Sequence, residues 1–167
     1  MSTVEPYGPC RLEALVAATG YTAYRGADGG SYLTILACEP PVHELRVLWC
    51  CEGSATSPVH VVRATSPTCC YPAEEAPALF GLLNRWHLEH RWPKACLRPR
   101  PSGEVEVVAD SEYPLGPGIH DELLGELTRV SLAASLELFN WLAEQYRPAV
   151  PGDLDISELE AQFHKAG

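Results

Sequence analysis

The sequence lacks any long apolar run, and this bears on where the protein works. No stretch approaches the roughly 20 consecutive apolar residues that a membrane-spanning helix needs. The first six residues show no basic cluster followed by an apolar stretch, which a secretory signal peptide would have. We therefore expect a cytoplasmic protein with no membrane partner.

Positive charge is also scarce. Only 12 Lys and Arg residues stand against 22 Asp and Glu residues, which gives a formal net charge of −10 over 167 residues. Such a charge repels phosphate backbones unless basic residues gather locally. The densest basic group is interrupted by prolines and consists of Arg91, Lys94, Arg98 and Arg100. We predict no direct binding of nucleic acid, whereas an acidic surface favours a basic protein partner.

The common catalytic and phosphate-binding motifs are missing as well. The chain contains no Gly-x-Ser-x-Gly, no Gly-x-Gly-x-x-Gly and no phosphate-binding loop. A nucleophile needs a neighbouring base, and nothing in the sequence links Cys96, near Lys94, with His120. Asp110 and Glu112 could form a carboxylate pair, but a solvated strand end explains them better. We predict no enzymatic activity, no catalytic residue and no cofactor.

Two closely spaced histidines offer the sharpest alternative, which is a metal site. His87 and His90 are three positions apart on one predicted helix, and Cys69 and Cys70 precede them. Structural zinc sites usually take pairs of cysteines in Cys-x-x-Cys spacing, and this spacing does not occur here. A metal- or thiol-based sensor is therefore the alternative function, and a solvated helix end is the simpler interpretation of the histidines.

Cysteine is abundant, with seven residues and two adjacent pairs, Cys50-Cys51 and Cys69-Cys70. Neighbouring residues of a strand point to opposite faces of a sheet. Cys50 and Cys51 should therefore lie in different environments instead of forming one site. Buried free cysteine, acting as a small apolar residue, is the simpler interpretation for a cytoplasmic protein.

Turn residues and apolar periodicity divide the first half into one helix and several strands. The helix is predicted from Pro9, which suits the first helical position, to Thr19, because Gly20 can end it. Short connections between the strands indicate an antiparallel meander. The predicted strands are residues 21–25, 31–38, 45–51 and 59–64.

The second half predicts a helix, a hairpin and a long helix. The first of these helices begins between Pro72 and Pro77 and ends before Pro93. In the hairpin, Val105 and Val107 should face inward while the glutamates beside them face water. The hairpin strands are residues 95–98 and 104–109, and the long helix is residues 119–146.

This order predicts an α+β fold class, a twisted antiparallel sheet with three helices. We expect one domain over residues 1–147, followed by a tail over residues 148–167. The tail is too short to fold alone, so we expect it to dock as a short helix with Ile156, Leu159 and Phe163 on one side.

Several short motifs mark residues 75–142. They are Leu82-Leu83-Asn84-Arg85-Trp86-His87, Lys94-Ala95-Cys96-Leu97, Gly103 with the strand 104–109, Ile119-His120-Asp121-Glu122-Leu123-Leu124, Phe139 and Trp141. On these motifs the chain resembles the YbjN family of bacterial proteins, which are often labelled sensory transduction regulators. The resemblance implies a fold similar to class I type III secretion chaperones. Those are small acidic homodimers that bind extended segments of client proteins without ATP.

We therefore predict a non-catalytic adaptor or chaperone-like regulator that acts as a homodimer and binds a client protein. The client is expected to be basic, for example a nucleic-acid-binding protein. Trp92, at a helix end, should be an exposed contact residue, whereas Trp86 and Trp141 should be buried. The further candidate contacts are the small residues Ser131, Ala134 and Ser135 of the long helix.

Overall fold

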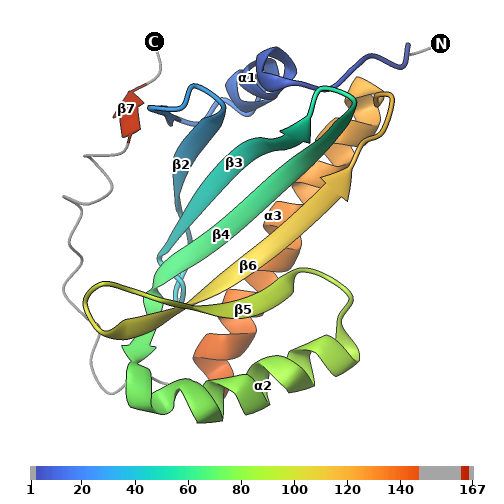
Figure 1. Cartoon of the computed structure of the whole chain (residues 1–167). Helices are drawn as coiled ribbons and strands as arrows, with labels where there is room; N and C mark the ends of the chain where they lie inside the picture. The colour runs from blue at the N-terminus through green and yellow to red at the C-terminus, as the bar shows by residue number, and fades with distance from the viewer. Residues whose placement is uncertain (1–2, 147–162, 166–167) are drawn as a thin grey trace.

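The computed structural model describes residues 3–146 and 163–165. An α+β architecture with an antiparallel sheet and three helices is confirmed (Figure 1). The elements in chain order are α1 (Pro9–Ala18), β1 (Ala23–Gly26), β2 (Ser31–Ala37), β3 (Glu44–Ser54), β4 (Ser57–Pro72), a short 3-10 helix (Ala73–Glu75), α2 (Ala76–Glu89), β5 (Lys94–Pro99), β6 (Glu104–Pro114), α3 (Asp121–Gln145) and β7 (Phe163–Lys165).

The sheet has the strand order β5-β6-β4-β3-β2-β1-β7. The predicted antiparallel meander is confirmed, because each of β1 to β4 pairs antiparallel with its neighbour in sequence. The chain then leaves the sheet through α2 and returns so that β6 pairs with β4 and β5 lies outside it. Strands β4 and β6, which are distant in sequence, are therefore neighbours in the sheet.

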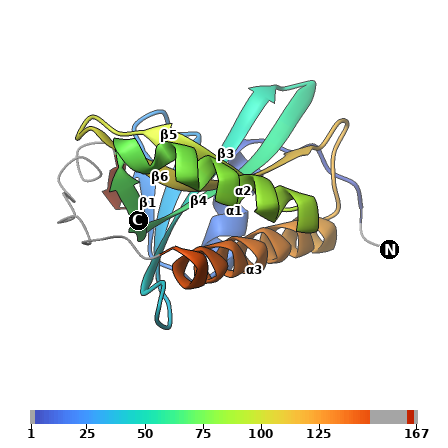
Figure 2. The ribbon, with the colours of Figure 1, turned by 90° about the horizontal axis from the view of Figure 1, so that it is seen from below.

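One face of the sheet is covered by helices. In Figure 1, α1 and α3 lie behind the sheet, while α2 runs across its lower end. Figure 2, viewed from below, shows α2 beside α3. The shared core joins buried apolar side chains of all three helices with the covered face of the sheet. It includes Leu12, Val16, Val47, Trp49, Val62, Ala64, Leu79, Trp86, Leu138 and Phe139.

The opposite face, toward the viewer in Figure 1, has no helix over it among the described residues. Arg63 lies at its centre and forms ion pairs with three carboxylates. Its guanidinium is 2.7 Å from Glu52, 3.2 Å from Asp110 and 3.3 Å from Glu112. Partly exposed pairs of this kind contribute little stability individually, whereas Leu33, Val61 and Val108 on the same face are buried.

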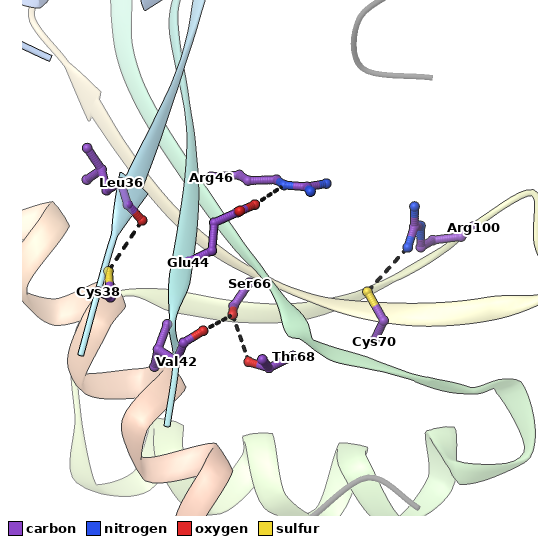
Figure 3. Close-up of polar contacts among 9 residues, drawn as sticks. All are labelled: Leu36, Cys38, Val42, Glu44, Arg46, Ser66, Thr68, Cys70 and Arg100. Carbon is purple, nitrogen blue, oxygen red and sulfur yellow. Dashed lines mark hydrogen bonds and ion pairs between the residues drawn. The ribbon is translucent and has the colours of Figure 1, made fainter. Parts of the chain in front are cut away.

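Strand β4 is much longer than the predicted strand 59–64. The register shifts between Thr65 and Cys70, so β4 continues through a bulge up to Pro72. Pro67 cannot donate to a ladder, and the bulge accommodates it without ending the strand. The Ser66 hydroxyl hydrogen-bonds to the Val42 carbonyl oxygen over 3.4 Å and ties the bulge to the β2–β3 connection (Figure 3).

The last described segment is a strand. β7 pairs antiparallel with β1, with Phe163 opposite Gly26 and Lys165 opposite Tyr24. Phe163, which we expected on a docking helix, therefore lies in a strand, whereas Ile156 and Leu159 lie outside the described residues. No helix in the described ranges is both long and apolar enough to cross a membrane.

Candidate protein-binding groove

An apolar hollow of about 350 Å³ opens beside α3 at the end of strands β2 and β3. Its floor includes Leu36 and Leu45, which project from these strands, and one wall is the half-buried pair Leu132 and Leu136 of α3. Leucines four positions apart lie on the same side of a helix. Ile35, 39% exposed, lies at its margin. The hollow therefore presents apolar surface from a sheet and a helix together.

The hollow continues along α3. A second depression of about 510 Å³ shares Ala133 and Leu136 with the first, and is lined further by Trp141 and by two glutamates, Glu137 and Glu144. We call the two depressions together the α3 groove. Its chemistry changes along its length, because it is apolar beside the sheet and acidic toward the end of α3.

The small residues of α3 do not all lie where we expected them. Ser131 and Ser135, which we predicted as partner contacts, are buried where α3 meets the sheet, so their side chains are not on the surface of the described residues. Their hydroxyls donate to the carbonyl oxygens of Leu127 and Ser131, four residues earlier, over 2.8 and 2.7 Å. Small, internally satisfied side chains let the sheet approach the helix closely. Ala134 is half-buried.

Trp86 is buried and Trp92 is exposed, as expected, whereas Trp141 is less buried than expected. Trp86 is fully buried and Trp141 is partly buried against the core. Trp92 is 51% exposed and packs edge-on against Tyr113, with ring centroids 5.9 Å apart. Trp92 is thus available as a contact residue, although it does not line the α3 groove.

A buried polar chain crosses from the sheet to α3. His60 of β4 is fully buried, and its Nδ1 lies 2.7 Å from the Tyr7 hydroxyl while its Nε2 lies 3.2 Å from Thr128 Oγ1. The adjacent Tyr113 hydroxyl hydrogen-bonds to Ser131 over 2.9 Å. Burial lowers the pKa of His60 to about 4. A neutral imidazole with partners on both nitrogens holds elements together and has no free nitrogen for a ligand.

The two histidines of the alternative metal site have separate partners. His87 Nε2 accepts the backbone N–H of Ala95 over 2.9 Å. The His90 ring stacks on Trp86 with centroids 3.7 Å apart, and its Nδ1 lies 3.2 Å from the Trp86 carbonyl oxygen. The described ranges contain no group of three or more His, Cys, Asp or Glu placed to hold a metal ion. The structure therefore does not bring His87, His90 and the Cys69-Cys70 pair together.

The cysteines are free thiols in distinct environments. Cys51 packs against the core, whereas Cys50 is on the opposite face of β3, as predicted. In Figure 3 the Cys70 sulfur accepts a hydrogen bond from Arg100 over 3.4 Å. Burial raises the pKa of Cys50 and Cys69 to about 11. A thiol kept protonated reacts slowly, which does not suit a redox sensor.

The other residues considered as catalytic candidates in the sequence lie apart from one another or have structural partners. Asp110 and Glu112 both form ion pairs with Arg63, at 3.2 and 3.3 Å. Burial raises the pKa of the Cys96 thiol, whose charged neighbours include Asp110. His120 is the residue before α3. The structure describes no contact between Cys96 and His120.

The model of the YbjN family, described as "putative bacterial sensory transduction regulator", matches residues 9–144. The chain belongs to the YbjN family. No curated protein matches it.

The YbjN match covers more of the chain than the motifs of residues 75–142 did, and it includes all three helices. The match begins at the first residue of α1 and ends one residue before the end of α3. The α3 groove therefore lies entirely within the YbjN region. The description of the YbjN family is that of a regulator, and this is the functional statement that membership supplies.

Sequence reasoning missed the residues of the α3 groove. Leu132 and Leu136 were not distinguished from the buried stripe of α3, which consists of Leu124, Thr128, Ser131, Ser135, Leu138, Phe139 and Leu142. A signal was present, since these leucines fall outside the stripe at a spacing of four residues. An apolar arc wider than the buried face indicates a second contact.

Proposed function

We propose that this protein is a non-catalytic, chaperone-like regulator that acts as a homodimer and binds a segment of a client protein in the α3 groove. The observation that carries the proposal is the apolar end of that groove. Leu36, Leu45, Leu132 and Leu136 line a hollow whose margin residue Ile35 is 39% exposed. Exposed apolar surface that is concave and rimmed by polar groups is typical of a binding site.

The charge around the groove supports a basic client. Glu137 and Glu144 line its far end, and the side chain of Glu137 is 65% exposed. His90 Nε2 lies 3.9 Å from its carboxylate. A client segment with apolar side chains followed by Lys or Arg would match both ends of the groove. The net charge of −10 would also attract such a client at long range.

The environment of the ionisable residues supports a role without turnover. His60 is enclosed, His87 and His90 are engaged separately, and Asp110 is held by Arg63. Catalysis needs a nucleophile, base or electrophile that faces a substrate. We further propose that the protein works in the cytoplasm, where thiols are kept reduced, because its seven cysteines are free.

The proposal is tested by comparing client capture by two variants that each place arginine at an exposed position of α3. Ala133→Arg fills the centre of the groove with a cation, and Glu122→Arg adds the same side chain near the start of the helix. Proteins captured from the native cell are quantified by mass spectrometry. We expect the specific client to be lost with Ala133→Arg and retained with Glu122→Arg.

The captured client then supplies the second measurement. Its binding is followed at two salt concentrations, and the complex should weaken at the higher one, because exposed charge pairs are screened. Equal capture by both variants contradicts the groove as the binding site. Affinity that does not change with salt contradicts the acidic contribution.

A further inference from the structure

We propose that a small anion with a phosphate group, either the free ion or a small phosphorylated organic molecule, binds in a polar hollow where α2 ends and β5 begins. This hollow, the α2–β5 hollow, has a volume of about 670 Å³. It shares no lining residue with the α3 groove. Concave sites in which a few polar groups converge are typical of small-ligand binding. Its lining residues are His87, Leu88, Glu89, His90, Arg91 and Lys94.

The densest basic group of the sequence is divided in the structure. Arg98 forms an ion pair of 2.9 Å and Arg100 one of 3.8 Å, each with a glutamate of β6. The other two members, Arg91 and Lys94, are exposed and line the α2–β5 hollow. Neither has an ion pair with a carboxylate of the described residues. Two permanent cations therefore face the same hollow without a counter-charge from this part of the chain.

The two cations of the hollow differ in this respect from most basic residues of the fold. Apart from them and Arg85, each Lys or Arg of residues 3–146 has a carboxylate within 4.0 Å. Arg85 lies over the Trp141 ring. Lys94 is opposite Asp110 in the β5–β6 register, but that carboxylate pairs with Arg63. An anion in the hollow would supply the counter-charge that the described fold does not.

His87 adds a neutral hydrogen-bond donor to the hollow. Its Nε2 accepts the backbone N–H of Ala95 over 2.9 Å, so the ring proton is on Nδ1. The same hydrogen bond holds the ring against β5. A phosphate oxygen can accept from Nδ1–H, while the guanidinium of Arg91 and the ammonium of Lys94 balance the phosphate charge.

Two features oppose an anion here, and both are limited. Glu89 is one carboxylate against two permanent cations. The C-terminal end of a helix carries partial negative charge. However, the Trp86 carbonyl oxygen is engaged twice by His90, by its backbone N–H over 2.8 Å and by its Nδ1 over 3.2 Å. With two cations and one neutral donor, the hollow suits a single phosphate group and not the extended backbone of a nucleic acid.

The test titrates the purified full chain with sodium phosphate and follows the backbone ¹H–¹⁵N NMR signals of Arg91, Lys94 and Ala95. We expect saturable shifts with phosphate and none with chloride at the same ionic strength. Arg91→Gln and Lys94→Gln should each raise the dissociation constant at least about tenfold. The matched control is Arg129→Gln, at an exposed arginine of α3 that pairs with Glu126, and it should bind phosphate as the wild type does.

A parallel titration with glycerol 3-phosphate separates the two sources of the phosphate group. An affinity no higher than that for phosphate assigns the hollow to the free ion, and a higher affinity assigns it to a phosphorylated organic molecule. The side-chain ¹⁵N signals of His87 should also shift on binding, with the proton kept on Nδ1.

The proposal is overturned if phosphate causes no saturable shift, or if Arg91→Gln and Lys94→Gln bind it as the wild type does. The two cations would then only complement the dipole of α2. Client capture by the α3 groove is measured without phosphate, so neither result depends on the proposed function.

Discussion

The Tyr7 hydroxyl lies 2.7 Å from Nδ1 of His60, although 53 positions separate the two residues in the chain. The other ring nitrogen of His60 continues the chain to Thr128 of α3. One imidazole thus connects the segment before α1, the centre of the sheet and the longest helix. These contacts require the ring to stay in place, and burial there disfavours its charged form.

The free energy of unfolding should therefore fall as the pH falls from about 6.5 to 4. The folded pKa of His60 is depressed to about 4, while the unfolded pKa is near 6.5, so the unfolded chain binds a proton that the folded chain excludes in this window. The contribution of neutral His60 to the free energy of unfolding is fully present above the unfolded pKa. At pH 4.5 the free energy of unfolding should be lower by about 2.5 kcal/mol. Urea denaturation at pH 7 and at pH 4.5 measures it.

His60→Gln supplies the control, because an amide can donate and accept hydrogen bonds but does not titrate in this range. The variant is expected to be less stable than the wild type at pH 7. Its free energy of unfolding should differ much less between pH 7 and pH 4.5 than that of the wild type. An unchanged slope in His60→Gln would show that another group titrates.

Gly118→Ala should destabilise the protein by more than about 1 kcal/mol. Gly118 has a φ of +149°, and a Cβ there would lie 2.3 Å from the Glu5 carbonyl oxygen. That oxygen accepts the backbone N–H of Ile119 over 3.0 Å, so it cannot move freely. Gly125→Ala, in the interior of α3 with open space around it, should instead stabilise by about 0.5–1 kcal/mol. Thermal unfolding of the two variants measures the opposite signs.

Ser135→Leu should destabilise the protein by about 1–3 kcal/mol, because Ser135 is fully buried where α3 meets the sheet. Ala133→Leu, two positions away on the exposed side of the same helix, should change stability by less than about 0.5 kcal/mol. Chemical denaturation compares them. Equal effects would mean that both sides of α3 are packed alike, contrary to the burial described above.

Thiol reactivity should separate Cys10 from the other cysteines. Cys10 is exposed, while burial raises the pKa of Cys38, Cys51, Cys70 and Cys96 and brings Cys50 and Cys69 to about 11. With a disulfide reagent at pH 8 we expect one fast equivalent in the native protein, absent in Cys10→Ser, and all seven after denaturation. Several fast thiols in the native state would revive the thiol-based sensor.

Much of the fold follows from local signals in the chain. Pro9 begins α1, and Gly20, with a φ of +72°, follows it in the left-handed conformation that ends helices. Val105 and Val107 are buried while the glutamates beside them are partly exposed. These positions were predictable because proline, glycine and period-two alternation act over a few residues.

Other features depend on partners distant in sequence. Pro67 is a strand-breaking signal when considered alone, yet the bulge of β4 lets the strand run on to Pro72 beside β6. In the sequence, the small residues Ser131 and Ser135 suggest a contact surface. In the structure, their hydroxyls hydrogen-bond to backbone carbonyl oxygens of α3 itself. The α3 groove escaped prediction for the same reason, because its floor and its wall come from strands and a helix about 90 residues apart.

The position of β4 between β3 and β6 has a consequence for dividing the chain. A fragment ending at Pro72 would keep the four-stranded meander. It would lose α3, and with it the cover over Val62 and Ala64. Strands whose apolar side chains are exposed to solvent tend to associate between molecules. The two halves of the molecule are therefore inseparable as stable products, and a proteolytic cut between β4 and α2 should lead to precipitation instead of two smaller folded pieces.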